Sequence, residues 1–158
     1  MSMPQHFNVV VINEESPYGG EVAGAATTLL RAPERGIQPY IVAAATHGRC
    51  RLALNEVLSA RRLMLWRPVP PQFLDPRAID LWLALDEIAE SVARRMIQES
   101  GPAPSRFYRH VFPDPVQSLG IQISHPPSKR HLDKWLDELR AATRPWRERI
   151  WQAFYDSS

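Results

Sequence analysis

Cysteine, lysine and long apolar runs are nearly missing from this sequence. A single cysteine among 158 residues excludes an intramolecular disulfide, which fits a reducing compartment. The longest mostly apolar stretch, around 79–85, is interrupted by Asp80 and is far shorter than the roughly 20 residues needed to span a bilayer. The first residues carry neither a basic region nor a long apolar run, so no signal peptide is expected. We therefore expect a cytoplasmic protein that does not contact membranes.

Positive charge comes almost entirely from arginine, because Lys129 and Lys134 are the only lysines. Arginine favours bidentate contacts with carboxylates and phosphates, although a GC-rich genome would produce the same bias. The net charge of +2 hides two basic segments. Residues 31–67 hold seven arginines and two glutamates, and residues 129–149 hold seven basic and four acidic side chains. This distribution favours an acidic protein partner or a nucleic-acid backbone.

Glycine is also scarce, with seven residues against 15 prolines, which predicts short elements joined by stiff connections. The patterns of apolar residues predict strands over 7–12, 37–46, 63–66, 107–112 and 119–124. They predict helices over 51–62, 76–98, 128–142 and 143–154, whereas 22–31 fits either a helix or a strand. No internal repeat or linker divides the chain, so we expect one domain over 1–158, with a C-terminal helical segment at about 128–155.

The helix expected over 76–98 has the clearest signals. Asp75 is a good N-cap, and Pro76 suits the first helical position. Acidic residues come before Arg94 and Arg95, as the helix dipole favours. The expected fold is therefore α/β or α+β. It is a small single-domain mixed sheet of three to five strands, covered by this long central helix, with two short C-terminal amphipathic helices.

The segment Thr46–Arg51 collects the reactive side chains. It follows an expected strand and precedes an expected helix, where α/β proteins commonly place their sites. A helix N-terminus and Arg49 would lower the pKa of the Cys50 thiol, which makes Cys50 and His47 weak candidates for catalysis. Only one glycine lies nearby, however, and Cys50 fits equally well as a small buried residue. An anion-binding turn or an ordinary basic turn are the other interpretations.

Two groups of residues are candidates for binding. The candidates for contact with an anion or a nucleic acid are Arg49, Arg51, Arg61, Arg62 and Arg67. The candidates for docking on a partner are Trp146, Trp151 and Phe154, because aromatic residues are of the types that interface centres prefer. Trp146, Ile150 and Phe154 recur at helical spacing. The same aromatic spacing would also dock a helix on its own core.

Other titratable residues form no recognisable motif. His110 could pair with Asp114 as a general base, but the sequence places no serine or cysteine as its nucleophile. Glu14, Glu15 and Glu21 follow the first strand and could hold Mg²⁺, although acids in a polar loop are usually just solvated. No metal-ligand spacing and no phosphate-binding loop occurs. We therefore predict no cofactor and no metal.

These observations favour a non-enzymatic binding or adaptor protein, a subunit of a larger assembly that uses its arginine-rich surface. A protein partner is expected, a nucleic acid is an alternative partner, and no membrane is expected. The alternative function is a small hydrolase or transferase that uses the Thr46–Arg51 loop, with Cys50 or His47 as its reacting group.

Overall fold

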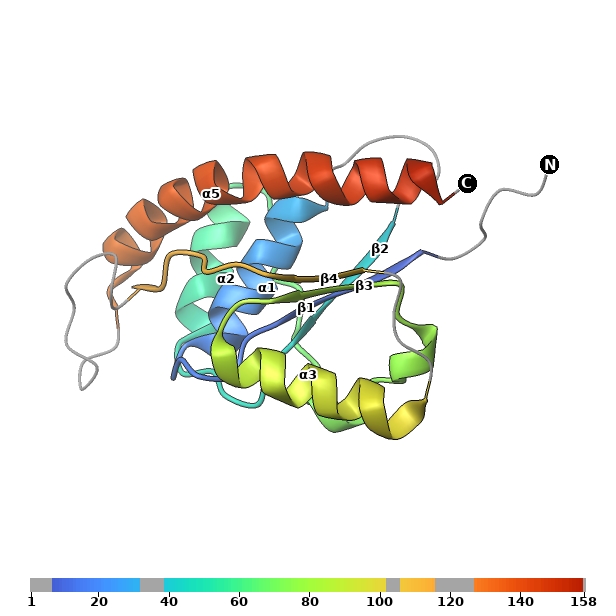
Figure 1. Cartoon of the computed structure of the whole chain (residues 1–158). Coiled ribbons are helices and arrows are strands. Elements are labelled where there is room, and N and C mark those ends of the chain that lie inside the picture. The colour runs from blue at the N-terminus through green and yellow to red at the C-terminus, as the bar shows by residue number, and fades with distance from the viewer. Residues whose placement is uncertain (1–6, 32–38, 102–105, 116–126, 158) are drawn as a thin grey trace.

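The structure, a computed structural model, describes residues 7–31, 39–101, 106–115 and 127–157. Its centre is a parallel sheet in the order β2-β1-β3-β4, made of β1 (Asn8–Ile12), β2 (Tyr40–Ala44), β3 (Leu81–Ala84) and β4 (Arg106–Arg109). One face is covered by α1 (Gly19–Leu30), α2 (Arg51–Ala60) and α5 (Lys129–Asp156), and the other by α3 (Glu87–Ser100) (Figure 1). The expected α/β class and number of strands are confirmed.

The two central strands carry apolar side chains on both faces. In β1, Val9 and Val11 point into the larger core beneath α1, α2 and α5, whereas Val10 and Ile12 point into the smaller core beneath α3. All four residues of β3, from Leu81 to Ala84, are fully buried. Continuous apolar runs of this kind are typical of parallel strands that are covered on both faces.

Because β3 is buried on both faces, the prediction of a single helix over 76–98 is wrong for the first half of that segment. The segment instead forms a short 3-10 turn, Pro76–Ala78, then β3, and only then α3. Asp75 does cap this turn, but the N-cap of the long helix is Asp86, whose side chain accepts a hydrogen bond from the backbone N–H of Ala89. A short apolar run does not distinguish a buried strand from a buried helix by periodicity alone.

The strand expected over 63–66 is not formed. Instead this segment runs as extended chain against α1, where the Thr28 hydroxyl donates a hydrogen bond to the carbonyl oxygen of Met64. The chain reaches the sheet only at Val69, which exchanges backbone hydrogen bonds with Ala43 and Ala45 along the outer side of β2. The outer edge of β2 is thereby partly covered.

Gly24 allows this close approach, because a Cβ atom there would lie 2.6 Å from the carbonyl oxygen of Trp66 and 2.9 Å from a methyl carbon of Leu65. We predict that Gly24→Ala lowers the free energy of unfolding by about 1–2 kcal/mol. The overpacking costs more than the gain in helix propensity returns. Urea unfolding measures this difference, and an alanine variant as stable as the wild type would contradict it.

The C-terminal region is one helix, α5, rather than the two short helices expected. Ser128 is the N-cap, as expected, and accepts a hydrogen bond from the backbone N–H of His131. Pro145 lies exposed inside the helix and removes one backbone hydrogen bond. Leu136 and Leu139 before Pro145 and Ile150 after it are all buried in the larger core. Their packing keeps the helix continuous on both sides of the proline. Figure 1 shows α5 as a gently bent rod across the top of the fold.

The strand expected over 119–124 lies outside the described residues.

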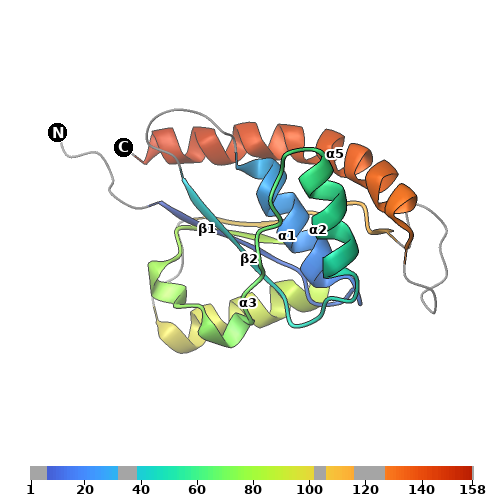
Figure 2. The same ribbon diagram turned by 180° about the vertical axis from the view of Figure 1, so that it is seen from behind.

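Seen from behind, α1 and α2 lie side by side below α5 (Figure 2). Within the part of the chain that the structure describes, no helix has the length and apolarity to cross a membrane.

Candidate functional site

The loops that follow all four strands meet at one edge of the sheet, because the strands are parallel. Carboxyl edges of open α/β sheets are where such proteins place their ligand sites. The loop between β1 and α1 is fixed there by Asp86: its Oδ2 accepts hydrogen bonds from the backbone N–H groups of Glu14 (2.8 Å) and Glu15 (3.1 Å). The same carboxylate caps α3 through the N–H of Ala89 (2.7 Å). The backbone N–H groups of Glu14 and Glu15 are therefore already hydrogen-bonded to a carboxylate of the protein.

Ser16, in this loop, contacts Asp114, which follows β4. The Ser16 hydroxyl donates a hydrogen bond to Oδ2 of Asp114, and its Oγ accepts one from the backbone N–H of Tyr18 (3.0 Å). The indole N–H of the buried Trp135 donates to the carbonyl oxygen of Pro113 (2.7 Å), which holds the neighbouring Asp114 against α5. A hydroxyl and a carboxylate 98 residues apart in sequence are thereby paired at the edge of the sheet.

Glu21 is a buried acid in the first turn of α1, with 1% of its surface exposed. Its Oε1 accepts a hydrogen bond from the backbone N–H of Cys50 (2.6 Å), the residue that precedes α2. Its Oε2 is buried, with no hydrogen-bond partner among the described residues. A Cβ atom at Gly48 would lie 3.2 Å from Oε1, so the glycine allows this approach. The N-terminus of α2 is thus supplied with a negative charge from within the protein.

Cys50 is buried beside the Glu21 carboxylate, and both the burial and the carboxylate affect the pKa of its thiol. Burial raises the pKa of the Cys50 thiol to about 12, and the charge of Glu21 and a hydrogen bond with it add to the effect. Burial also raises the pKa of the Tyr18 phenol, to which Cys50 adds, while Arg49 opposes the rise. These effects disfavour the thiolate form of Cys50, so its weak candidacy as a nucleophile gains no support and stays a prediction.

The other members of the Thr46–Arg51 loop are exposed. Thr46, His47, Gly48 and Arg49 line a cleft of about 420 Å³, together with Glu15 and Pro17, the two neighbours of Ser16 in the sequence. Asp114 contributes to the raised pKa values of both Cys50 and Tyr18, so it lies within electrostatic reach of this loop. We define the edge site as His47 and Arg49, which line this cleft, together with Ser16 and its partner Asp114, which do not line it but lie beside Glu15 and Pro17 through Ser16.

The five arginines predicted to contact an anion are not brought onto one surface. Arg49 and Arg51 lie at the start of α2 and Arg61 and Arg62 at its end, and a helix of ten residues separates its ends by about 15 Å. Arg61 is also held in ion pairs with Asp133 and Asp137. Arg67 is exposed in the segment beyond α2. Contact with an anion by the remaining arginines stays a prediction.

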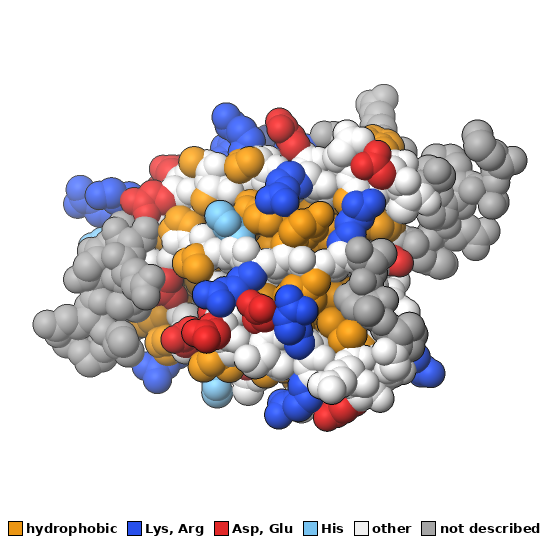
Figure 3. All heavy atoms as spheres, viewed as in Figure 1, with side chains coloured by type: hydrophobic (Ala, Val, Ile, Leu, Met, Phe, Trp, Pro, Cys, Tyr) orange, Lys and Arg blue, Asp and Glu red, His pale blue; other side chains and the backbone are white. Residues whose placement is uncertain are grey.

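The aromatic residues predicted to dock on a partner, Trp146, Trp151 and Phe154, are buried in the protein's own core. They dock α5 on its own sheet, and docking on a partner stays untested. Trp146 packs edge-on against Tyr108 of β4, and Arg149 lies over both rings. Figure 3 shows this face, with hydrophobic side chains between α5 and the lower half of the molecule and cationic side chains across them.

Ser16 was not predicted as a site residue, and Asp114 was expected to pair with His110. The structure pairs Asp114 with Ser16, whereas the His110 ring packs against Phe112 and Trp146. Burial lowers the pKa of His110, and the charge of Arg149 adds to this shift. The grouping of Glu14, Glu15 and Glu21 is not formed as a metal site: across residues 7–31, 39–101, 106–115 and 127–157, no three His, Cys, Asp or Glu side chains are grouped to hold a metal ion.

This parallel sheet with its helices matches the fold of the low-molecular-weight phosphatases. The solved structures it resembles include the tyrosine phosphatase Wzb from Escherichia coli K30 in complex with sulphate, with 16% identity, a TM-score of 0.56, and coverage of 92% of this chain and 99% of that one. The arginine phosphatase YwlE, known from Bacillus subtilis, has 13% identity, a TM-score of 0.53, and coverage of 91% and 95%. No family model and no curated protein matches the sequence.

The YwlE structure also differs from this sequence at its active-site position. It is a variant whose active-site residue, the seventh of that chain, is a phosphorylated serine in place of cysteine. The present chain has no cysteine among its first 49 residues, so a cysteine so early in the chain has no counterpart here.

The fold corrects the expected function. A non-enzymatic adaptor or complex subunit was the first expectation, but the solved structures that share the fold are tyrosine and arginine phosphatases, which are enzymes. The expectation of a complex subunit built for protein–protein interaction is therefore wrong. The alternative of a small hydrolase or transferase agrees better with the fold.

Proposed function

We propose that this protein hydrolyses phosphate monoesters at the edge site, with the Ser16 hydroxyl as its nucleophile. The observation that carries the proposal is the hydrogen bond from the Ser16 hydroxyl to the Asp114 carboxylate. A serine needs an adjacent base to become a nucleophile, and a carboxylate in direct contact meets that need. The phosphorylated active-site serine of the YwlE variant supports a serine as a phosphoryl acceptor within this fold.

Ser16 and Asp114 together can accept and return every proton that the proposed reaction moves. Ser16 Oγ attacks the phosphorus while its proton passes to Asp114, and the bond from phosphorus to the leaving oxygen breaks. Asp114 then returns the proton to the leaving alcohol. A water molecule attacks the phosphoserine, its proton passes through Asp114 to Ser16 Oγ as the P–Oγ bond breaks, and phosphate leaves. The net reaction consumes one ester and one water and yields an alcohol and phosphate.

Arg49 and His47 are the groups we assign to hold the phosphate. Both are exposed and line the same cleft as Glu15 and Pro17. A guanidinium binds phosphate oxygens through two parallel hydrogen bonds. Backbone amides contribute little, because those of Glu14 and Glu15 are already bound to Asp86 and that of Gly20 to the carbonyl oxygen of His47.

We further propose that the enzyme acts in the cytoplasm, since its one cysteine, Cys50, is a free thiol and free thiols persist in reducing compartments. The protein partner expected from the sequence would then be a phosphorylated substrate rather than a subunit of an assembly.

Hydrolysis of p-nitrophenyl phosphate by the purified protein tests the proposal. We expect Ser16→Ala to lose the activity and Asp114→Asn to lower it about 10²–10⁴-fold, because the base that takes the serine proton is removed. Acid quenching followed by mass spectrometry is expected to find phosphate on the peptide that contains Ser16.

Two control variants accompany this experiment. Ser59→Ala removes an exposed hydroxyl from α2 and is expected to leave the rate unchanged. Cys50→Ala is expected to retain activity, because the thiol takes no part in the reaction. An active Ser16→Ala variant, or loss of activity in Cys50→Ala alone, would refute the serine mechanism.

A further inference from the structure

The C-terminal ends of α1 and α2 meet α5 (Figure 2). A second cavity, of about 540 Å³, is lined by residues at these helix ends and on α5. We call it the arginine cavity. Its charged lining residues are Arg31, Arg61, Arg140, Arg144 and Arg147, and the rest of its lining is Thr28, Leu29, Leu63 and Thr143. Among the described residues, no acidic side chain lines it. Such a concentration of cations without acids in a concave site requires an explanation.

Three of these arginines belong to one face of α5. Arg140, Arg144 and Arg147 are spaced i, i+4 and i+7, which places them on the same side of a helix. Arg140 and Arg144 are exposed, and neither forms an ion pair with any residue that the structure describes. Thr143 is buried between them. The two exposed guanidinium groups are therefore available to an external anion.

Arg31, at the end of α1, is fixed in place without a counter-ion. Its guanidinium donates a hydrogen bond to the carbonyl oxygen of Ile41 (3.0 Å) and lies 3.6 Å from the centre of the Trp66 ring. Within the described part of the chain, no carboxylate pairs with it. A stacked, half-buried cation of this kind is pre-organised for an anionic ligand.

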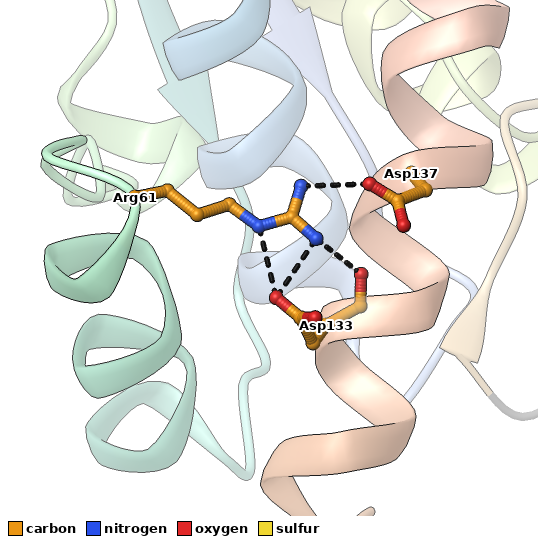
Figure 4. Close-up of polar contacts among 3 residues, drawn as sticks. All are labelled: Arg61, Asp133 and Asp137. Carbon is orange, nitrogen blue, oxygen red and sulfur yellow. Dashed lines mark hydrogen bonds and ion pairs between the residues drawn. The ribbon is translucent and has the colours of Figure 1, made fainter.

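Arg61 has a different role, because its charge is already balanced. It lies between Asp133 (2.8 Å) and Asp137 (3.0 Å) of α5, as Figure 4 shows. These ion pairs join the end of α2 to α5 and fix that wall of the cavity. Arg31, Arg140 and Arg144 therefore remain as three cations with no paired carboxylate among the described residues.

We propose that the arginine cavity binds a multivalent phosphate anion, either inorganic polyphosphate or the phosphate chain of a nucleoside polyphosphate. The planar forks of arginine match phosphate oxygens, and several adjacent phosphates would satisfy three unbalanced cations. The cavity has the size of a small-molecule site. It lies at the far end of α2 from the edge site, about 15 Å away along the helix, so this ligand is not the substrate of the proposed hydrolysis.

Isothermal titration calorimetry with inorganic tripolyphosphate tests this proposal on the full chain. We expect binding that weakens as salt is raised. We expect the double substitution Arg140→Gln with Arg144→Gln to weaken it by at least about tenfold, because two charge-assisted contacts are lost. Equal or tighter binding of ATP would identify a nucleoside polyphosphate as the ligand, whereas weaker binding of ATP would identify inorganic polyphosphate.

The matched control is Arg130→Gln with Lys134→Gln. It removes the same charge at the same spacing from exposed positions of the same helix, outside the cavity, and is expected to leave the affinity within about twofold. If both double variants weakened tripolyphosphate binding equally, the binding would be a non-specific attraction to positive charge, and the proposal would be overturned. It would also be overturned if Arg49→Gln alone abolished binding, or if a single-stranded oligonucleotide bound and tripolyphosphate did not.

Discussion

Iodoacetamide is expected to alkylate Cys50 in the folded protein about a thousandfold more slowly than it alkylates an unstructured cysteine at pH 8. Only the thiolate reacts, and an ordinary thiol with a pKa near 8.5 is substantially ionised at that pH. Burial and the neighbouring Glu21 carboxylate raise the pKa of Cys50 to about 12, so the thiolate is a very small fraction. The low exposure of the side chain, 6%, slows the reaction further.

The alkylation rate is measured by mass spectrometry over time, with the same protein in denaturant as the control. Unfolding is expected to restore the rate of an ordinary cysteine. Glu21→Gln is expected to accelerate alkylation of the folded protein only in part, because it removes the charge but leaves the burial, which is the larger cause of the raised pKa. Fast alkylation of the folded wild type would instead restore Cys50 as a candidate nucleophile.

The surroundings of Cys50 show what the local sequence of the Thr46–Arg51 loop does not contain. A cysteine before a helix and beside an arginine suggests a lowered pKa, and Glu21 reverses that conclusion. Glu21 is 29 residues away in the chain, and in the sequence it looks like one more acid in a polar loop. Only the packing of α1 against the loop before α2 turns it into a buried charge.

Elements with local signals were predictable from the sequence. The strand at β1 and the helix at α2 follow from apolar patterns, and the cap at Ser128 from the preference of serine for N-caps. The strand β3 was missed because its burial on both faces depends on α3 and α5, which the local pattern does not contain. The pairing of Ser16 with Asp114 depends in the same way on the order of the strands in the sheet, which brings the ends of β1 and β4 to one edge.

Trp135 links the stability of the fold to the edge site. Its side chain is completely buried in the larger core, and its indole N–H donates to the carbonyl oxygen of Pro113. We predict that Trp135→Ala lowers the free energy of unfolding by about 3–5 kcal/mol, because a large apolar group is removed and a cavity remains. Phe73→Ala removes an aromatic ring that is 76% exposed and is expected to change stability by less than about 0.5 kcal/mol. Urea unfolding measures both.

Trp135→Phe separates the two roles of this residue. Phenylalanine retains much of the apolar packing but cannot donate to Pro113, so the part-buried carbonyl loses its partner at a cost of about 0.5–1.5 kcal/mol. The segment that carries Asp114 then loses its attachment to α5, and the contact between Asp114 and Ser16 is weakened. We therefore expect the hydrolysis rate of folded Trp135→Phe to fall by more than its KM changes, because a proton acceptor is displaced while Arg49 and His47 are untouched. If Trp135→Phe were less stable but hydrolysed the substrate at an unchanged rate, the role of Trp135 would be packing in the core alone. Asp114 would then be positioned by other contacts.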